Sequence, residues 1–192
     1  NAEAILGNAI KWQADIALVD WLALNNTGGT VGFPGQTIVD VTLDATNLLG
    51  GTYYTQIEIA TNEPLNPSII VPVVLTVVGI PQIQVSDTSF DFGSVIIGNT
   101  ESYTFTINNP GTDTLFISSI TTSTGYTVSA STIAVPPLQS TTVTVTFTPT
   151  AIQNYNGTLT INNNVTPTTI ALIATGQGAP AAAATPTSIT QT

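Results

Sequence analysis

The chain has 192 residues, with 11 acidic residues against a single base, Lys11, and a formal net charge of −10. It has no Cys and no His, which excludes disulfides, thiolate zinc sites and catalysis by either side chain. The missing basic residues argue against nucleic acid and anionic membranes as partners. No apolar run reaches the roughly 18 residues of a membrane span, so no membrane insertion is expected.

The first 35 residues form the least regular part of the chain. Residues 9–14 alternate as a strand does, residues 19–24 are short and apolar, and Gly-rich turns follow. We predict that Trp12 and Trp21 are core aromatics of a first sandwich. A stacking role for Trp21 beside the Gly-rich loop is the alternative.

Two later stretches of the chain repeat one another. Val143, Val145 and Phe147 alternate with threonines, which predicts a strand with one buried face. A tyrosine and two further strands follow, up to residue 176. Residues 36–79 repeat this block, with 38–41 lying over 142–145. The chain is therefore interpreted as a tandem repeat.

Between these blocks, residues 82–86 alternate, and residues 88–95 are predicted to continue this first strand with Phe90 and Phe92 on one face. About seven short strands with regular turn signals are typical of an immunoglobulin-like sandwich. The fold class expected is all-β, with two tandem immunoglobulin-like antiparallel β-sandwiches of which the first lacks its N-terminal strands. The domains expected are 1–79, 80–177 and an extended tail, 178–192.

Several motifs of the second unit then carry a family resemblance. They are Phe90-Asp91-Phe92-Gly93, Asn108-Asn109-Pro110-Gly111, Phe147-Thr148-Pro149, Tyr155-Asn156-Gly157 and the closing Thr175-Gly176. With these, residues 83–176 resemble the ASH (abnormal spindle and hydin) immunoglobulin-like domains and the bacterial choice-of-anchor repeats. Residues 8–78 resemble a sister repeat. The resemblance implies sandwiches used as spacers, adhesins or fibre subunits, and no catalytic residues.

The first unit is short at its start, and the tail has the sequence of a first strand. Residues 178–189 align without a gap on residues 79–90, which places Ile189 on Phe90. One hypothesis is that the tail of one subunit completes the first sandwich of the next, in a head-to-tail homopolymer. The donor residues are then Ala182, Ala184, Thr187 and Ile189, and the acceptor region is Ile5, Ile10 and Trp12. The alternatives are a window cut from a longer repeat array and a flexible linker.

Few residues suggest site chemistry, and no cofactor is expected. Two acid pairs, Asp40 with Asp44 and Asp87 with Asp91, are weak candidates for Ca²⁺. An isopeptide bond from Lys11 would need an acid such as Asp15 or Asp20. Glycosylation triplets begin at Asn25, Asn156 and Asn164.

The function expected is structural: a subunit of an extracellular or cell-surface filament or array, and no enzyme. The alternatives are an adhesin or carbohydrate-binding stalk with surface glycans as partners, and accessory domains of a larger secreted protein. Glycan binding would need an aromatic cluster, for which Trp21, Phe33, Tyr53 and Tyr54 are the candidates.

Overall fold

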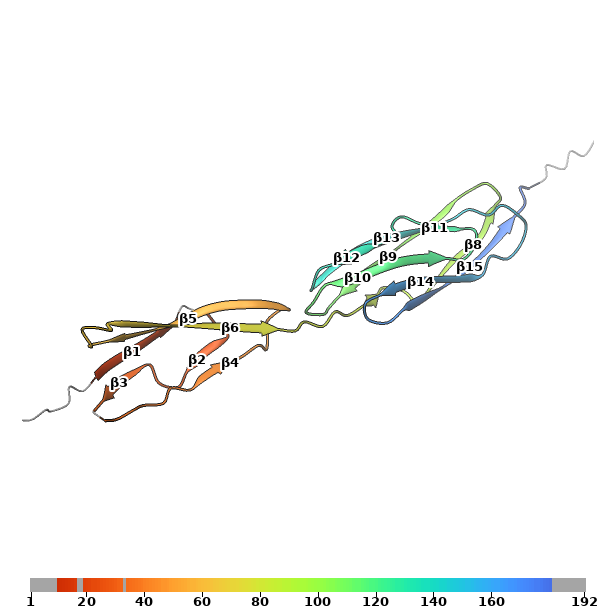
Figure 1. Cartoon of the computed structure of the whole chain (residues 1–192). Coiled ribbons are helices and arrows are strands. Elements are labelled where there is room, and N and C mark those ends of the chain that lie inside the picture. Colours follow the sequence, from red (N-terminus) through yellow and green to blue (C-terminus); the bar gives the residue numbers. More distant parts are fainter. Residues whose placement is uncertain (1–9, 17–18, 33, 181–192) are drawn as a thin grey trace, which may run out of the picture. The chain divides into compact units, whose positions relative to one another are not determined.

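The computed structural model describes residues 10–16, 19–32 and 34–180, and gives only the backbone for 10–12 and 14–16. All regular elements in this part of the chain are β-strands (Figure 1). The chain divides into two compact units, Asn1–Gly79 and Ile80–Thr192.

The second unit is a sandwich of two sheets, with strand orders β12-β10-β14-β15-β8 and β11-β13-β9-β7. Every described pairing is antiparallel except that of β8 with β15, which is parallel. The strands are β7 (Gln84–Val85), β8 (Ser89–Ile96), β9 (Glu101–Asn109), β10 (Leu115–Thr122), β11 (Tyr126–Val128), β12 (Ile133–Val135), β13 (Gln139–Phe147), β14 (Gly157–Asn163) and β15 (Thr168–Gln177).

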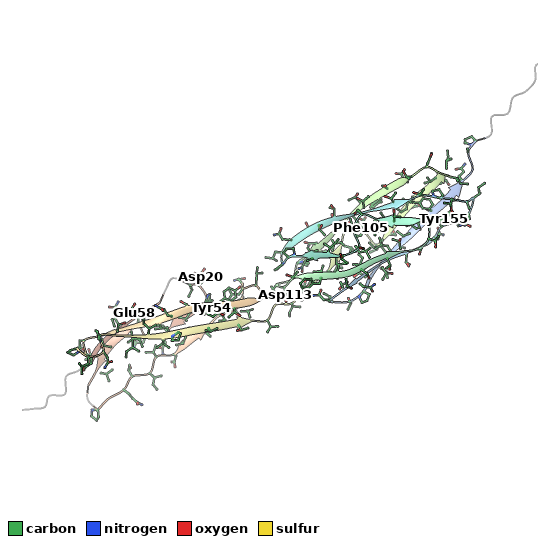
Figure 2. The ribbon with its side chains drawn as sticks, turned by 45° about the horizontal axis from the view of Figure 1, so that its top comes forward. Asp20, Tyr54, Glu58, Phe105, Asp113 and Tyr155 are labelled. Carbon is green, nitrogen blue, oxygen red and sulfur yellow. The ribbon has the colours of Figure 1, made fainter. Side chains whose placement is uncertain are left out.

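Alternation along these strands produces the core. Val143, Val145 and Phe147 are fully buried, as the sequence predicts, while the threonines between them face outward. Phe105 from β9 is buried opposite them, and Figure 2 shows its place within the unit. These residues belong to one continuous apolar cluster that joins the two sheets.

The first strand of this unit is not continuous, which corrects the expectation for residues 88–95. β7 pairs with β9, and Ser86 ends that pairing through hydrogen bonds to the backbone of Thr106. The chain then crosses to the other sheet, where the Ala171 N–H donates to the Thr88 carbonyl and β8 runs beside β15. The crossing lets Phe90 and Phe92 enter the core from the sheet opposite β9.

The first unit has the same plan with fewer strands. Its larger sheet has the order β3-β1-β5-β6, and its smaller sheet is the pair β2-β4. Trp21, Leu22 and Ile57 form the centre of its core, so the smaller sheet packs on the larger one. The strands are β1 (Ile10–Ile16), β2 (Leu22–Leu24), β3 (Gly28–Val31), β4 (Val41–Leu43), β5 (Gly51–Thr61) and β6 (Ser68–Val77).

The two strand orders correspond element by element. β3-β1-β5-β6 matches β12-β10-β14-β15, and β2-β4 matches β11-β13. Within the described residues, the first unit has no strand in the places of β7, β8 and β9. The all-β, immunoglobulin-like fold expected from the sequence is confirmed.

Candidate strand-acceptor site

Hydrogen bonds fix the correspondence between β4 and β13. Leu43 lies opposite Leu22 as Phe147 lies opposite Tyr126. Three residues further along β2, Asn25 donates its N–H to the Asp40 carbonyl and accepts the Asp40 N–H on its side chain. Ser129 makes the same two bonds to Thr144. Val41 is therefore equivalent to Val145, and Leu43 to Phe147.

These equivalent side chains differ sharply in burial. Val145 and Phe147 are 0% exposed, whereas Val41 is 45% and Leu43 is 43% exposed. In the second unit the two residues lie opposite Tyr103 and Glu101 of β9, the neighbour of β13. The first unit has no counterpart of β9 in its described part, so its core is open beside β4.

The backbone of β4 is open on the same side. The Asp44 N–H donates to the Trp21 carbonyl over 2.8 Å. Because the direction of backbone groups alternates along a strand, the N–H and C=O groups of Val41 and Leu43 point away from β2. Beside β4 the molecule therefore presents unpaired ladder groups together with exposed apolar side chains, which is what an added strand requires.

A second open edge runs along β6. Tyr53 and Tyr155 each bond through the hydroxyl to backbone four residues upstream, Leu49 and Ala151 respectively, which aligns β5 with β14. Val71 is then equivalent to Ile170, because these residues pair with Ile57 and Leu159. Val71 is 40% exposed and Ile170 is 0% exposed, since β8 has no counterpart beside β6 in the described residues.

Of the residues proposed from sequence as acceptor and donor, the structure describes only Ile10 and Trp12, and these by their backbone. Both are in β1, where Trp12 pairs with β3 on one side and with β5 on the other, whereas Ile10 pairs with Val31 of β3 and has no partner in β5. Ile5 lies outside the described residues, as do the donor residues Ala182, Ala184, Thr187 and Ile189. The alternation of Val39, Val41 and Leu43 marks one face of β4 in the sequence, but only the pairing shows that this face is uncovered.

Of the four candidate aromatics for glycan binding, the three that the structure describes do not form one surface. Trp21 is buried, as predicted, and its ring packs edge-on against that of Tyr53, with the ring centroids 6.3 Å apart. Tyr54 points to the opposite face of β5 and is 73% exposed (Figure 2). Phe33 lies outside the described residues.

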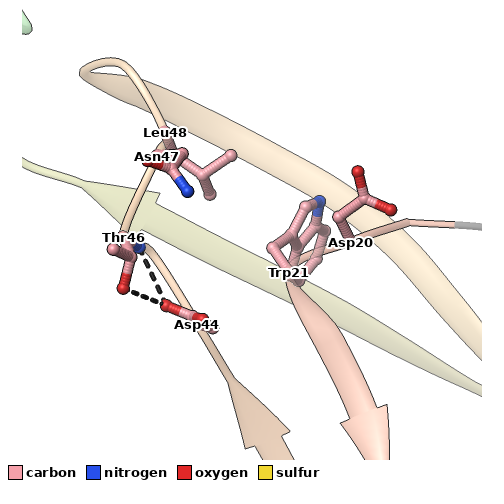
Figure 3. Close-up of a pocket in the computed structure, with 6 residues that line it drawn as sticks. All are labelled: Asp20, Trp21, Asp44, Thr46, Asn47 and Leu48. Carbon is pink, nitrogen blue, oxygen red and sulfur yellow. Dashed lines mark hydrogen bonds between the residues drawn. The ribbon is translucent and has the colours of Figure 1, made fainter.

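Beside Trp21 there is a small hollow of about 70 Å³ (Figure 3). Ligand pockets usually measure about 300–1,000 Å³, so this hollow is too small for a sugar ring and its neighbours. Its lining residues are Asp20, Trp21, Asp44, Thr46, Asn47 and Leu48.

The candidate calcium carboxylates are occupied by local hydrogen bonds. Asp44 accepts from both the backbone and the hydroxyl of Thr46, and these bonds lower the pKa of its carboxyl (Figure 3). Asp40 accepts from the Asn25 amide, and Asp91 from the Gly93 N–H. In the described part of the chain, no three acidic residues gather as a metal site.

The isopeptide candidate rests on side chains outside the described part of the structure, and the three glycosylation asparagines make local hydrogen bonds. The side chains of Lys11 and Asp15 are not described. Asn25 bonds to Asp40, Asn156 accepts from the Ala174 N–H, and Asn164 bonds to the backbone of Thr114 and Phe116.

The two facing sheets and their order define an immunoglobulin-like β-sandwich protein. A family model for the HYDIN/CFA65/VesB-like Ig-like domain matches residues 81–177, which is 97 of the 192 residues. The chain therefore belongs to the HYDIN/CFA65/VesB-like Ig-like family. The ASH-type resemblance seen in the sequence is confirmed by this match.

Solved structures show weaker similarity. A protein of unknown function from Porphyromonas gingivalis W83 is 16% identical over 87% of this chain and 84% of its own, with a TM-score of 0.44. The ASH/PapD-like domain of human CEP192 is 12% identical over 51% of this chain and 87% of its own, with a TM-score of 0.44. Domains 4 and 5 of the S-layer protein SbsC are 17% identical over 91% of this chain and 74% of their own, with a TM-score of 0.37.

Similarities at these TM-scores carry no argument about function or assembly. No curated protein matches the chain. Within residues 10–16, 19–32 and 34–180, no helix has the length and apolarity that crossing a membrane would require.

Proposed function

We propose that this protein is a structural subunit of an extracellular or cell-surface filament or array. Subunits assemble head to tail, with residues 178–192 of one subunit completing the first sandwich of the next. The observation that carries this proposal is the half-exposure of Val41 and Leu43, whose equivalents Val145 and Phe147 are fully buried. A core that is open along a free backbone edge is stabilised by an added strand.

The tail supplies a suitable sequence for that strand. Residues 178–189 align in sequence on residues 79–90, which include β7 and the start of β8, and the tail carries no charged side chain. The donor residues proposed are Ala182, Ala184, Thr187 and Ile189. Because tail and acceptor are different surfaces, the contact does not close on itself and propagates along a fibre.

The proposed location and the absence of catalysis rest on composition and family. Charged residues make up only 6% of the chain, so Thr, Ser, Asn and Gln solvate its surface, which suits a secreted β protein. Ser–His and Cys–His catalysis cannot occur in a chain without His and Cys. The partner proposed is therefore a second copy of this chain.

The test is negative-stain microscopy of the full chain beside a version that ends at Gly178. We expect filaments from the first and monomers from the second. Two substitutions refine the result: Ile189→Asp should suppress assembly, and Thr190→Asp, on the opposite face of the strand, should suppress it less. Monomers from the full chain, or filaments that survive the truncation, would refute the proposal.

A further inference from the structure

Two edge strands of the first unit, β4 and β6, lack the neighbouring strand that their counterparts β13 and β15 have in the second unit, and the observations distinguish between them. Resting on the function proposed above, we infer that the donor strand docks beside β4, antiparallel to it and in the place of β9. It does not dock beside β6 in the place of β8, although the tail aligns in sequence with residues 79–90.

The edge along β4 is not interrupted by a proline, since residues 35–43 contain none. In the second unit β9 pairs with all of β13, from Gln139 opposite Asn109 to Phe147 opposite Glu101. The corresponding residues of the first unit are 35–43, of which 41–43 form β4. Asn25 holds this segment through three hydrogen bonds to Asp40, so its β2 side is already paired.

The opposite side of that segment is free in both backbone and side chains. Alternation directs the backbone groups of Val39, Val41 and Leu43 away from β2. By their equivalence to the buried Val145 and Phe147, Val41 and Leu43 lie on the core side of this segment, and each is more than two-fifths exposed. One strand laid here would satisfy the ladder and cover the apolar side chains together.

The β6 edge is interrupted. Pro72 pairs with Gln56 as Ala171 pairs with Thr158, so Pro72 and Ala171 are equivalent. The Ala171 N–H donates to the Thr88 carbonyl over 2.9 Å at the start of the β8–β15 pairing. Proline has no N–H, and therefore β6 cannot make this bond. A proline on an outer edge is a common device against unwanted strand pairing.

The tail sequence selects one face for a strand beside β4. In β9 the residues that point into the core direct their backbone groups to β13, while Thr106, between them, bonds to Ser86 on the far side. If Ile189 points into the core, then so do residues 183, 185 and 187, and of the proposed donor residues Ala182 and Ala184 face outward. Pro180 and Pro186 then direct their nitrogens away from β4, where no N–H is needed. The opposite choice would expose Ile189 and aim Pro186 at the ladder.

Disulfide trapping can test whether the donor strand binds beside β4, because the chain contains no cysteine of its own. Thr42 and Ser188 would face outward on neighbouring strands, and such non-hydrogen-bonded pairs bring side chains close together. We expect the double variant Thr42→Cys with Ser188→Cys to give a ladder of covalent oligomers after oxidation of filaments. If the pairing is shifted by two residues, Thr190→Cys in place of Ser188→Cys gives the ladder.

Two matched variants serve as controls. Thr146 is the equivalent of Thr42 in the unit where β9 is present, so Thr146→Cys with either tail cysteine should give no ladder. Val74 is exposed on β6, two residues after Pro72. Val74→Cys combined with either tail cysteine therefore tests whether the donor strand binds at the β6 edge. If a ladder forms when a tail cysteine is combined with Val74→Cys, and not when it is combined with Thr42→Cys, the donor strand does not bind beside β4. The proposed function would not be affected.

Filaments that give no ladder with either Thr42 pair would also show that the donor strand does not bind beside β4. A second measurement needs no substitution: amide exchange of residues 39–43 should slow when wild-type subunits assemble. Unchanged exchange there in intact filaments would refute the inference. A wild-type chain that never assembles would refute the proposed function itself, and binding beside β4 with it.

Discussion

Leu43 and Phe147 hold the same position in the two units, each opposite the first residue of its partner strand, Leu22 or Tyr126. Phe147 is completely buried and contacts the rings of Phe92, Tyr126 and Tyr155. Leu43 keeps 43% of its surface exposed. The same strand pattern therefore gives a closed core in one unit and an open one in the other, and the difference is the strand beside it.

This difference predicts unequal costs of truncation. Phe147→Ala should destabilise the second unit by about 3–5 kcal/mol, because it removes a large buried ring and leaves a cavity. Leu43→Ala should destabilise the unassembled first unit by only about 1 kcal/mol, since nearly half of the side chain stays in water. Urea unfolding of the chain that ends at Gly178 would measure both. Equal costs would mean that Leu43 is packed in solution.

A buried asparagine holds the start of the second unit. Asn109 is fully buried, donates its amide to the carbonyls of Asp113, Val135 and Pro136, and accepts from Gln82 and Gly111. We expect Asn109→Ala to cost about 3 kcal/mol or more, because several buried backbone groups lose their partners together. Thermal unfolding would measure the loss.

The neighbouring residue provides the control. Asn108 is partly exposed, and among the hydrogen bonds described its side chain makes one, donated to the Gln84 side chain over 3.4 Å. Asn108→Ala should change stability by less than about 0.5 kcal/mol, as surface substitutions usually do. A large effect at Asn108, or a small one at Asn109, would contradict this account of the turn.

Alternation alone predicts the strands of the second unit and much of its core, including Val143, Val145 and Phe147. It does not reveal the break between β7 and β8, because both segments alternate and only the partner strand changes. The role of Asn109 is also hidden, since its bonds reach residues up to 27 positions away. For the candidate site, the pattern identifies the inward face of β4 but cannot show whether a neighbouring strand covers it.

Pro72 and Ala171 allow a reciprocal test of the β6 edge. Ala171→Pro should destabilise the second unit by about 1 kcal/mol or more, because the Thr88 carbonyl loses its hydrogen-bond donor at the start of the β8–β15 pairing. Pro72→Ala restores an N–H to an unpaired edge and should raise non-specific association of the chain that ends at Gly178. Unfolding curves and light scattering would measure the two effects. Unchanged light scattering of Pro72→Ala would show that Pro72 does not prevent strand pairing at the β6 edge.

Alkaline pH should destabilise the second unit through Tyr126. Burial, and secondarily the negative charge of Asp91, raise the pKa of this tyrosine from 10.0 to about 12, and its hydroxyl donates to the Tyr155 carbonyl over 2.8 Å. The folded state therefore keeps a proton that the unfolded state releases between these two values. The contribution of Tyr126 to stability is full below pH 10 and falls as the pH rises toward about 12. Unfolding free energies across this range should show the decline, and Tyr126→Phe should reduce it.

Asp91→Asn, which removes the charge but keeps an acceptor for Gly93, should move the ionisation of Tyr126 to lower pH in an absorbance titration. An unchanged titration would mean that burial alone sets the shift.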